Sequence, residues 1–494
     1  MVDERRPGNV GLGCALSLLV LLAGVVMGSA LTLGMLGLGP GALLAGRQAP
    51  TATPPAATTP TVEPPTALQG EAAPGRRLVW GSAIALDSDT REPDLLVVSR
   101  NYDRKPDSDS LAYLSPDAGA VRWESRPLGS NGNSWVVAYG DTMVLVADNA
   151  RLVGLRRASG ELAWEAPLTD GIAYSICRDC LQVFGEVVVA LPQDGVLQAF
   201  DLATGAPRWS VRLRQPTRQL VRVGALVGVP DSLPDAPSYG SLYLYNPADG
   251  APAGEILPSC TEAGGSERRI SYYMDIGVDP TGRTLAWLVP SSPVCLVAYD
   301  IPTGTLSRTR LEGFKGGDLK ERASLWSGDT LYLSDGARIY AVGAQEQRLV
   351  LEAEDHAVRP LAASGSALLV EARRTRGSSR YELWALDLPS GERRWERVLE
   401  ADDPRESARD IGDFVAGLVG DAVALVEQRE APEQIVYELI GLADGASRAR
   451  AALAVRDPGD AIRGATWGRD HVFLSIDELY GVELSSGRTA YAWP

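Results

Sequence analysis

The feature that most constrains the fold is a turn motif that recurs along most of the chain. Its clearest copy is Leu197–Leu213, which reads Leu-Gln-Ala-Phe-Asp-Leu-Ala-Thr-Gly-Ala-Pro-Arg-Trp-Ser-Val-Arg-Leu. Strand-type residues precede Asp201, and apolar residues alternate with polar ones after Gly205, which is the period of a half-buried strand. The Asp201 carboxylate can accept hydrogen bonds from downstream backbone N–H groups, and glycine adopts positive φ without a Cβ penalty. The stretch therefore predicts a β-hairpin.

Copies of this hairpin follow one another at intervals that lie mostly in the low-to-mid forties, with two longer ones. The repeat position of the turn is occupied in order by Gly119, Gly160, Gly205, Gly250, Gly304, Gln347, Gly391, Gly445 and Gly487. Two more apolar runs separate one hairpin from the next, which makes four strands per unit. This period is typical of β-propeller blades, and no long helical periodicity follows residue 76. The sequence predicts an all-β propeller of four-stranded blades over residues 76–494.

The number of blades stays open between seven, eight and nine. Nine turns are present, but propellers usually have four to eight blades, so we expect eight blades and one atypical unit. The ring has to close, because an open end would expose an apolar blade face and an unpaired strand edge.

An aromatic residue lies four positions after the repeat position in five copies. These residues are Trp123, Trp164, Trp209, Trp395 and, as a substitute, Tyr491. A large side chain at a fixed offset on an outer strand is suited to packing between neighbouring blades. We therefore interpret the aromatic set as core rather than as ligand contacts.

The N-terminal part of the chain predicts a membrane anchor. Residues 11–39 contain no charged residue and are long enough for one transmembrane helix, which needs about 20 apolar residues. Arg5 and Arg6 predict that residues 1–10 form a cytoplasmic tail. Residues 40–75 are rich in Pro and Thr and predict a disordered linker. We expect a signal-anchored, single-pass protein of the cell membrane with its propeller outside the cytoplasm, although Gly28-Ser-Ala30 would also suit a signal peptidase.

The charge of the chain argues against nucleic acid as a partner. The formal net charge is −16 at pH 7. An acidic surface of this size repels phosphate backbones and favours solubility.

The repeat resembles the tryptophan-docking motif of the quinoprotein (PQQ-like) propellers. The pattern Ala-x-Asp-x-x-(Thr/Ser)-Gly-x-x-x-Trp occurs at Ala199–Trp209 and at Ala385–Trp395, where it includes Asp387 and Gly391. The turn Val278–Leu285 looks like those of YVTN/WD40-type blades. The resemblance spans residues 76–494 and implies a propeller fold.

The resemblance implies two kinds of activity. The superfamily includes PQQ-dependent alcohol dehydrogenases and cofactor-free scaffolds such as the lipoprotein of the outer-membrane barrel-assembly machinery. The dehydrogenase pattern implies a calcium ion bound by acidic and amide side chains, a catalytic Asp and a disulfide between adjacent cysteines. This sequence has no adjacent cysteine pair, and no residue can be matched to the calcium ligands or to the base. We therefore expect no cofactor, with PQQ and calcium implied only under the dehydrogenase alternative.

Four cysteines lie in the repeats. Outside the cytoplasm they predict disulfides, with Cys177 and Cys180 forming one small bridge, for which a redox or metal site is the alternative. Strand order places Cys260 and Cys295 on one face of the same blade, so a bridge between them is geometrically reasonable.

Other polar clusters do not form a catalytic constellation. Asp103, Asp107 and Asp109 could hold calcium, but their spacing is not that of an EF-hand, and we interpret them as part of a solvated loop. His356 and His471 have no serine or cysteine nucleophile pattern nearby.

The sequence therefore favours a binding or scaffolding module for a protein or envelope ligand. The alternatives are a PQQ-dependent dehydrogenase and a sensor of polysaccharide or another ligand. Recognition usually lies in loops on a stiff frame. We expect the contact surface around residues 172–180, 230–240 and 258–270.

Overall fold

The chain divides into two units, Met1–Pro60 and Thr61–Pro494. The computed structural model describes only residues of the second unit. These are 66–67, 77–79, 83–86, 92–101, 108–128, 136–147, 151–172, 180–214, 219–230, 241–257, 277–279, 281–289, 294–311, 314, 324–343, 347–375, 381–399, 414–430, 433–456, 462–476 and 478–493. The predicted tail and transmembrane helix, and nearly all of the predicted linker, lie outside them. Among these described residues, no helix is long and apolar enough to cross a membrane.

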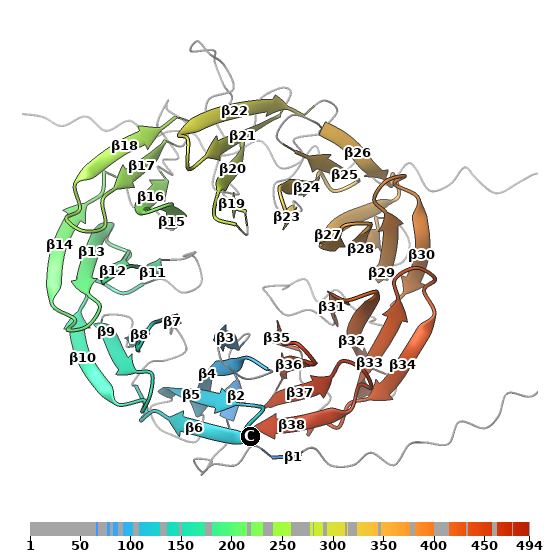
Figure 1. Cartoon of the computed structure of the whole chain (residues 1–494), viewed down its shortest axis with the longest axis horizontal. Helices are drawn as coiled ribbons and strands as arrows, with labels where there is room; N and C mark the ends of the chain where they lie inside the picture. The colour runs from blue at the N-terminus through green and yellow to red at the C-terminus, as the bar shows by residue number, and fades with distance from the viewer. Residues whose placement is uncertain are drawn as a thin grey trace, which may run out of the picture. The chain divides into compact units, whose positions relative to one another are not determined.

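The second unit is a ring of nine β-sheets, each built from consecutive strands (Figure 1). Blade 1 consists of β2 (Arg77–Val79), β3 (Ile84–Leu86), β4 (Asp94–Asn101), β5 (Ser108–Ser115) and β6 (Ala120–Glu124), with β2 and β3 both pairing with β4. Blade 2 consists of β7 (Val136–Tyr139), β8 (Thr142–Ala147), β9 (Arg151–Arg156) and β10 (Leu162–Pro167), and blade 3 of β11 (Leu181–Phe184), β12 (Val187–Ala190), β13 (Val196–Asp201) and β14 (Pro207–Arg212). Blade 4 consists of β15 (Val221–Val223), β16 (Leu226–Pro230), β17 (Leu242–Tyr245) and β18 (Pro252–Ile256), and blade 5 of β19 (Gly277–Val278), β20 (Thr284–Val289), β21 (Cys295–Asp300) and β22 (Thr305–Arg310).

Blades 6 to 9 repeat this order. Blade 6 consists of β23 (Ser324–Ser327), β24 (Thr330–Ser334), β25 (Arg338–Val342) and β26 (Gln347–Glu352), and blade 7 of β27 (His356–Ser364), β28 (Ala367–Arg374), β29 (Tyr381–Asp387) and β30 (Arg393–Val398). Blade 8 consists of β31 (Phe414–Val419), β32 (Ala422–Glu430), β33 (Glu433–Gly441) and β34 (Ser447–Ala452), and blade 9 of β35 (Gly464–Trp467), β36 (His471–Ser475), β37 (Leu479–Glu483) and β38 (Thr489–Trp493). A short strand, β1 (Thr66–Ala67), pairs in parallel with β38.

The all-β propeller of four-stranded blades is confirmed, but the expectation of eight blades is wrong. All nine turns belong to separate sheets, including the unit with Gln347 at the repeat position. Eight blades were expected only because larger propellers are rare. The degenerate unit still pairs four strands and buries Ile339 and Tyr340.

The middle strands of each blade bury both of their faces, which explains their continuous apolar runs. In β28, Leu368 and Val370 pack toward blade 6, whereas Ala367 and Leu369 pack toward blade 8. Alternation along a strand sends successive side chains to opposite faces, so each blade needs a neighbour on both sides. Buried apolar clusters join each blade to the next around the whole ring, and one of them joins blade 9 to blade 1.

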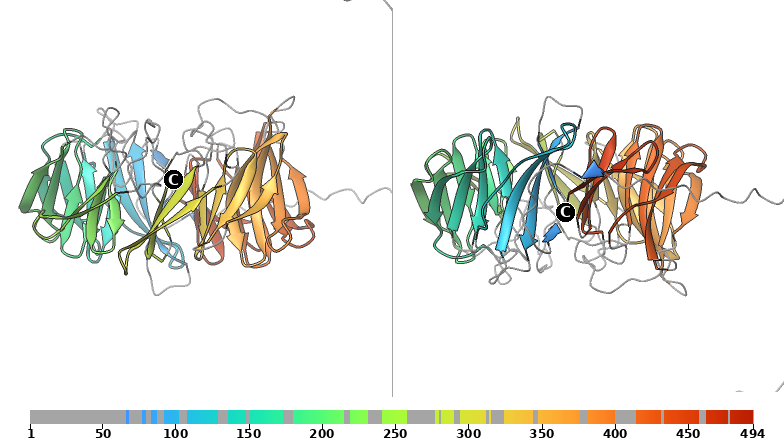
Figure 2. Two further views of the ribbon diagram at one scale, coloured as in Figure 1. Left: turned by 90° about the horizontal axis from the view of Figure 1, so that it is seen from above. Right: turned by 90° about the horizontal axis from the view of Figure 1, so that it is seen from below.

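The strand order creates two different faces of the ring, seen edge-on in Figure 2. On the turn face, short turns join the first strand to the second in blades 2 to 9, and the third strand to the fourth in every blade. On the loop face, longer connections lead from one blade to the next, for example residues 168–180, 257–276 and 399–413. The predicted contact surface, residues 172–180, 230–240 and 258–270, follows loop-face strand ends, although most of it lies outside the described residues.

Where the repeat aspartate is present, it organises its hairpin on the turn face. Asp201 accepts hydrogen bonds from the backbone N–H and the hydroxyl of Thr204 at 2.9 and 2.8 Å, and from the guanidinium of Arg208 at 2.6 Å. Asp387 makes the corresponding bonds with Ser390 and Arg394. Arg208 and Thr204 lower the pKa of Asp201 from 3.8 to about 2, and Arg394 and Ser390 do the same for Asp387.

The repeat tryptophans lie between blades. The indole N–H groups donate to a backbone carbonyl in the third-to-fourth-strand turn of the following blade. The pairs are Trp123 with Arg157, Trp164 with Leu202, Trp209 with Pro247 and Trp395 with Leu442, at 2.7 to 3.0 Å. Tyr491 lies differently: its ring is 5.0 Å from that of His471 in the same blade, and a Cβ at Gly119 would have no neighbour within 4 Å.

The repeat glycine is needed for two reasons where a tryptophan docks. At Gly205 the backbone has φ of +68°, and an added Cβ would lie 2.4 Å from Cε3 of Trp164. A left-handed backbone disfavours other residues, and the overlap with a packed ring excludes a side chain even if that strain is tolerated.

We predict that Gly205→Ala destabilises the propeller more than Gly185→Ala does. Gly185 lies in the same blade with φ of +58°, but nothing lies within 4 Å of an added Cβ there. Both variants incur about 1–2 kcal/mol of backbone strain, and Gly205→Ala adds about 1–3 kcal/mol of overpacking against Trp164. Urea denaturation midpoints measure the difference. Equal losses for the two variants would show that the contact with the indole is unimportant.

We also predict that Asp201 and Asp387 contribute to acid lability. Their folded-state pKa of about 2 lies below the ordinary 3.8, so they stabilise the fold above pH of about 4. This stabilisation is lost as the pH falls toward 2. The double variant Asp201→Asn, Asp387→Asn should show a shallower loss of stability between pH 4 and pH 2 in acid titrations followed by circular dichroism. Asp329→Asn is the control, because no arginine pairs with Asp329 in the part of the chain that the structure describes. An unchanged slope in the double variant would contradict this.

Candidate functional site

Two of the predicted disulfide cysteines are described, and both lie at the loop face. Cys180 precedes β11 and Cys295 begins β21; both are fully buried, and both are disulfide-bonded. Cys177 and Cys260 lie outside the described residues. The pairings Cys177 with Cys180 and Cys260 with Cys295 therefore stay predictions.

The acidic run from Asp103 to Asp109 is only partly described. Asp103 and Asp107 lie outside the described residues. Asp109 is a buried residue of β5 and is only 1% exposed, so its interpretation as part of a solvated loop is wrong. The strand that begins at Ser108 takes Asp109 into the blade. In the described parts of the chain, no group of three or more His, Cys, Asp or Glu side chains is arranged to hold a metal ion.

Each histidine lies beside a buried glutamate. His356 lies inside blade 7, and His471 lies at the interface between blades 9 and 1. Nε2 of His356 is 3.6 Å from Oε2 of Glu382, and the imidazole stands edge-on to Trp384. Glu382 also accepts from the indole N–H of Trp384 at 2.9 Å and from Nε of Arg374 at 3.3 Å. These contacts tie β27, β28 and β29 together.

His471 belongs to the closing interface between blades 9 and 1. Its Nδ1 lies 3.0 Å from Oε1 of Glu92, whose carboxylate also accepts from the backbone N–H groups of Arg469 and Asp470 at 3.0 and 2.6 Å. Glu92 is 1% exposed. A Cβ on Gly468 would lie 2.1 Å from this carboxylate, which makes glycine necessary there. Sequence reasoning missed Glu92, since it precedes β4 and belongs to no repeat motif.

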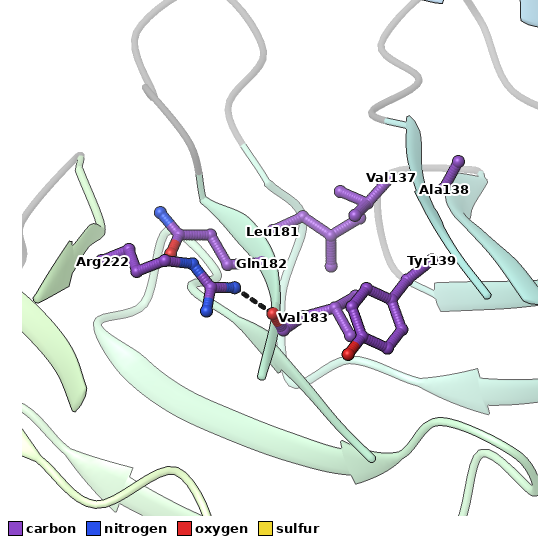
Figure 3. A pocket seen from close by; sticks show the side chains of 7 residues that line it. All are labelled: Val137, Ala138, Tyr139, Leu181, Gln182, Val183 and Arg222. Atoms are coloured by element: carbon purple, nitrogen blue, oxygen red, sulfur yellow. Dashed lines mark hydrogen bonds between the residues drawn. The ribbon is translucent and has the colours of Figure 1, made fainter. Parts of the chain in front are cut away.

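A pocket of about 330 Å³ lies on the inner wall of the ring, where the first strands of blades 2, 3 and 4 are adjacent (Figure 3). It is lined by Val137, Ala138, Tyr139, Leu181, Gln182, Val183 and Arg222. The pocket spans the inner wall, from Leu181 at the loop-face end of β11 to Tyr139 at the turn-face end of β7.

Arg222 is the charged residue of this pocket. Its guanidinium donates to the backbone carbonyl of Val183, a bond drawn in Figure 3, and its Cζ lies 4.1 Å from the centre of the Phe184 ring. The residue is exposed, yet the surrounding groups remove part of the water from the guanidinium, and this lowers its pKa. Sequence reasoning did not single out Arg222, because a lone arginine in a short strand has no distinguishing pattern.

Comparisons with known proteins bear on the repeats. Residues 107–267 match the family model described as outer membrane protein assembly factor BamB. No curated protein sequence matches the chain.

Several solved structures are similar at low identity. BamB from Moraxella catarrhalis shares 15% identity, with 83% of this chain and 95% of that chain covered and a TM-score of 0.37. A quinohemoprotein alcohol dehydrogenase, ADHIIG, from Pseudomonas putida HK5 shares 11% identity over 70% of this chain and 69% of its own, with a TM-score of 0.41. The dihydro-heme d1 dehydrogenase NirN, in complex with DHE, shares 16% identity over 75% of this chain and 74% of its own, with a TM-score of 0.43. The match at residues 107–267 confirms the resemblance of the repeats to the PQQ-like β-propeller repeat family.

Proposed function

We propose that this protein is a membrane-anchored, extracytoplasmic binding or scaffolding module that recognises a protein ligand through its loop face. The observation that carries the proposal is the asymmetry of the ring. The long connections, such as residues 257–276 and 399–413, all follow strand ends on one face, whereas the other face consists mostly of tight turns. A rigid frame with variable connections gathered on one side is suited to recognition.

Two exposed apolar residues lie at this face and can be used to probe it. Leu257, directly after β18, is 56% exposed, and Val398, at the end of β30, is 48% exposed. Both lie where an outer strand enters a long connection. Single exposed apolar residues are common, so these two serve as probe positions, and the proposal rests on the asymmetry of the connections.

The anchor and location are part of the same proposal. The uncharged stretch 11–39 and the Pro/Thr-rich linker 40–75 would hold the propeller away from the lipid surface, outside the cytoplasm. The net charge of −16 favours a protein or envelope partner over nucleic acid.

Site-specific photo-crosslinking of the full-length chain in its native cells tests the proposal. A photoreactive residue at Leu257 or Val398 should give discrete crosslinked protein bands. The same residue at Glu186, whose side chain is 91% exposed on the turn face, is the matched control and should give none. Crosslinks of equal yield at all three positions, or only at Glu186, would rule out loop-face recognition.

Two further measurements separate the alternatives. If reconstitution with PQQ and calcium gives dye reduction that depends on an alcohol or a sugar, the scaffold proposal is wrong and the protein is a dehydrogenase. Specific retention of wall polysaccharide, without protein crosslinks, would favour the sensor.

A further inference from the structure

The inner wall of the ring carries basic residues but no acidic ones on its described strands. The chain carries a net charge of −16, yet the described residues of the innermost strands β2, β3, β7, β11, β15, β19, β23, β27, β31 and β35 include no Asp or Glu. Basic residues occur there, among them Arg222 in β15 and Arg359 in β27. Arg359 pairs with Glu371 of the next strand. The innermost strands therefore offer no carboxylate of their own to pair with a cation on the wall.

Arg222 is a cation without a counter-charge. Within the described residues its contacts are the Val183 carbonyl and the face of the Phe184 ring, and no carboxylate pairs with it. A guanidinium has five N–H donors, and the carbonyl of Val183 occupies one of them. The contact with the Phe184 ring holds the plane of the Arg222 guanidinium in place, so its remaining N–H donors are preorganised for an anion.

A second unmet polar group lines the same pocket. The side-chain amide of Gln182 donates from Nε2 to the carbonyl of Leu220 at 3.2 Å. Its carbonyl oxygen Oε1 is buried and accepts no hydrogen bond from any described residue. Buried acceptors are usually satisfied, so this oxygen indicates a donor on a bound molecule or an ordered water.

The rest of the lining is apolar. Val137 and Leu181 lie beside the polar groups, and Tyr139, which is 48% exposed, faces the same space in Figure 3. A volume of about 330 Å³ is at the lower end for small-molecule sites, which combine an apolar surface with a few polar groups. Inorganic phosphate would leave the apolar lining unused.

We propose that this pocket binds a small organic anion. Its carboxylate pairs with Arg222, a hydroxyl or amide on the ligand donates to Gln182, and its apolar body lies on Val137 and Leu181. The site is on the inner wall of the ring, and the proposal does not depend on the loop-face recognition proposed above.

Isothermal titration calorimetry of the full-length chain in detergent tests the chemistry with four probes. The first, 2-hydroxy-4-methylpentanoate, carries all three features. Its neutral amide lacks the charge, 4-methylpentanoate lacks the hydroxyl, and inorganic phosphate lacks the apolar body. We expect the hydroxy acid to bind at least about tenfold more tightly than the neutral amide and than phosphate, and several-fold more tightly than 4-methylpentanoate. Equal binding of the amide, or equal binding of phosphate, overturns the proposal without any variant being needed.

Variants locate the site. Arg222→Gln should weaken binding of the hydroxy acid at least about tenfold. Arg310→Gln, on the exposed outer strand β22, is the matched control and should bind as the native chain does. Unchanged melting temperatures would show that both variants fold. Unchanged affinity in a folded Arg222→Gln variant, or an equal loss in the control, overturns the assignment to this pocket.

Discussion

The burial of both faces of every sheet is the constraint on which this structure depends. The middle strands carry apolar side chains on successive residues, so a single blade would leave one apolar face in water on each side. Closing the ring is the arrangement that gives every blade two neighbours. The tryptophans make this contact specific, because an indole on one blade donates to a carbonyl of the next and rests against a glycine there. The glycine thus shapes its own turn and accommodates the preceding blade.

The interfaces around the ring are not chemically equal. Indoles dock between blades 1 and 2, 2 and 3, 3 and 4, and 7 and 8. Between blades 6 and 7, the guanidinium of Arg348 donates to the backbone carbonyl of Leu388 at 2.7 Å. Between blades 8 and 9, the hydroxyl of Tyr437 donates to the backbone carbonyl of Leu484. Burial raises the pKa of Tyr437, so this hydroxyl stays a donor. The closing interface relies on Glu92 instead, because it joins the two ends of the repeat array.

The regular part of the fold could be predicted because it repeats. The spacing of the glycines predicts four-stranded blades, and the offset of Trp164 or Trp395 from its glycine predicts contact between blades. Blade number is not predicted correctly, because the nine turns are weighed against the usual range of propeller sizes, whereas the units without an aromatic at this offset still pair four strands and pack against their neighbours. Glu92 and Arg222 could not be found either. Each acts through groups distant in the sequence, such as the backbone N–H groups of Arg469 and Asp470 for Glu92.

The pairing of β1 with β38 determines where mechanical load would enter the fold. Thr66 and Ala67 pair in parallel with Tyr491 and Ala492, so the chain meets the ring at the outer edge of its last blade. The sheet of blade 9 thus combines its own four strands with β1 from ahead of blade 1. A pull on the chain ahead of Thr66 would therefore be borne first by backbone hydrogen bonds to blade 9, beside the junction held by Glu92. Strain on this part of the chain would reach that junction before it reached the other blades.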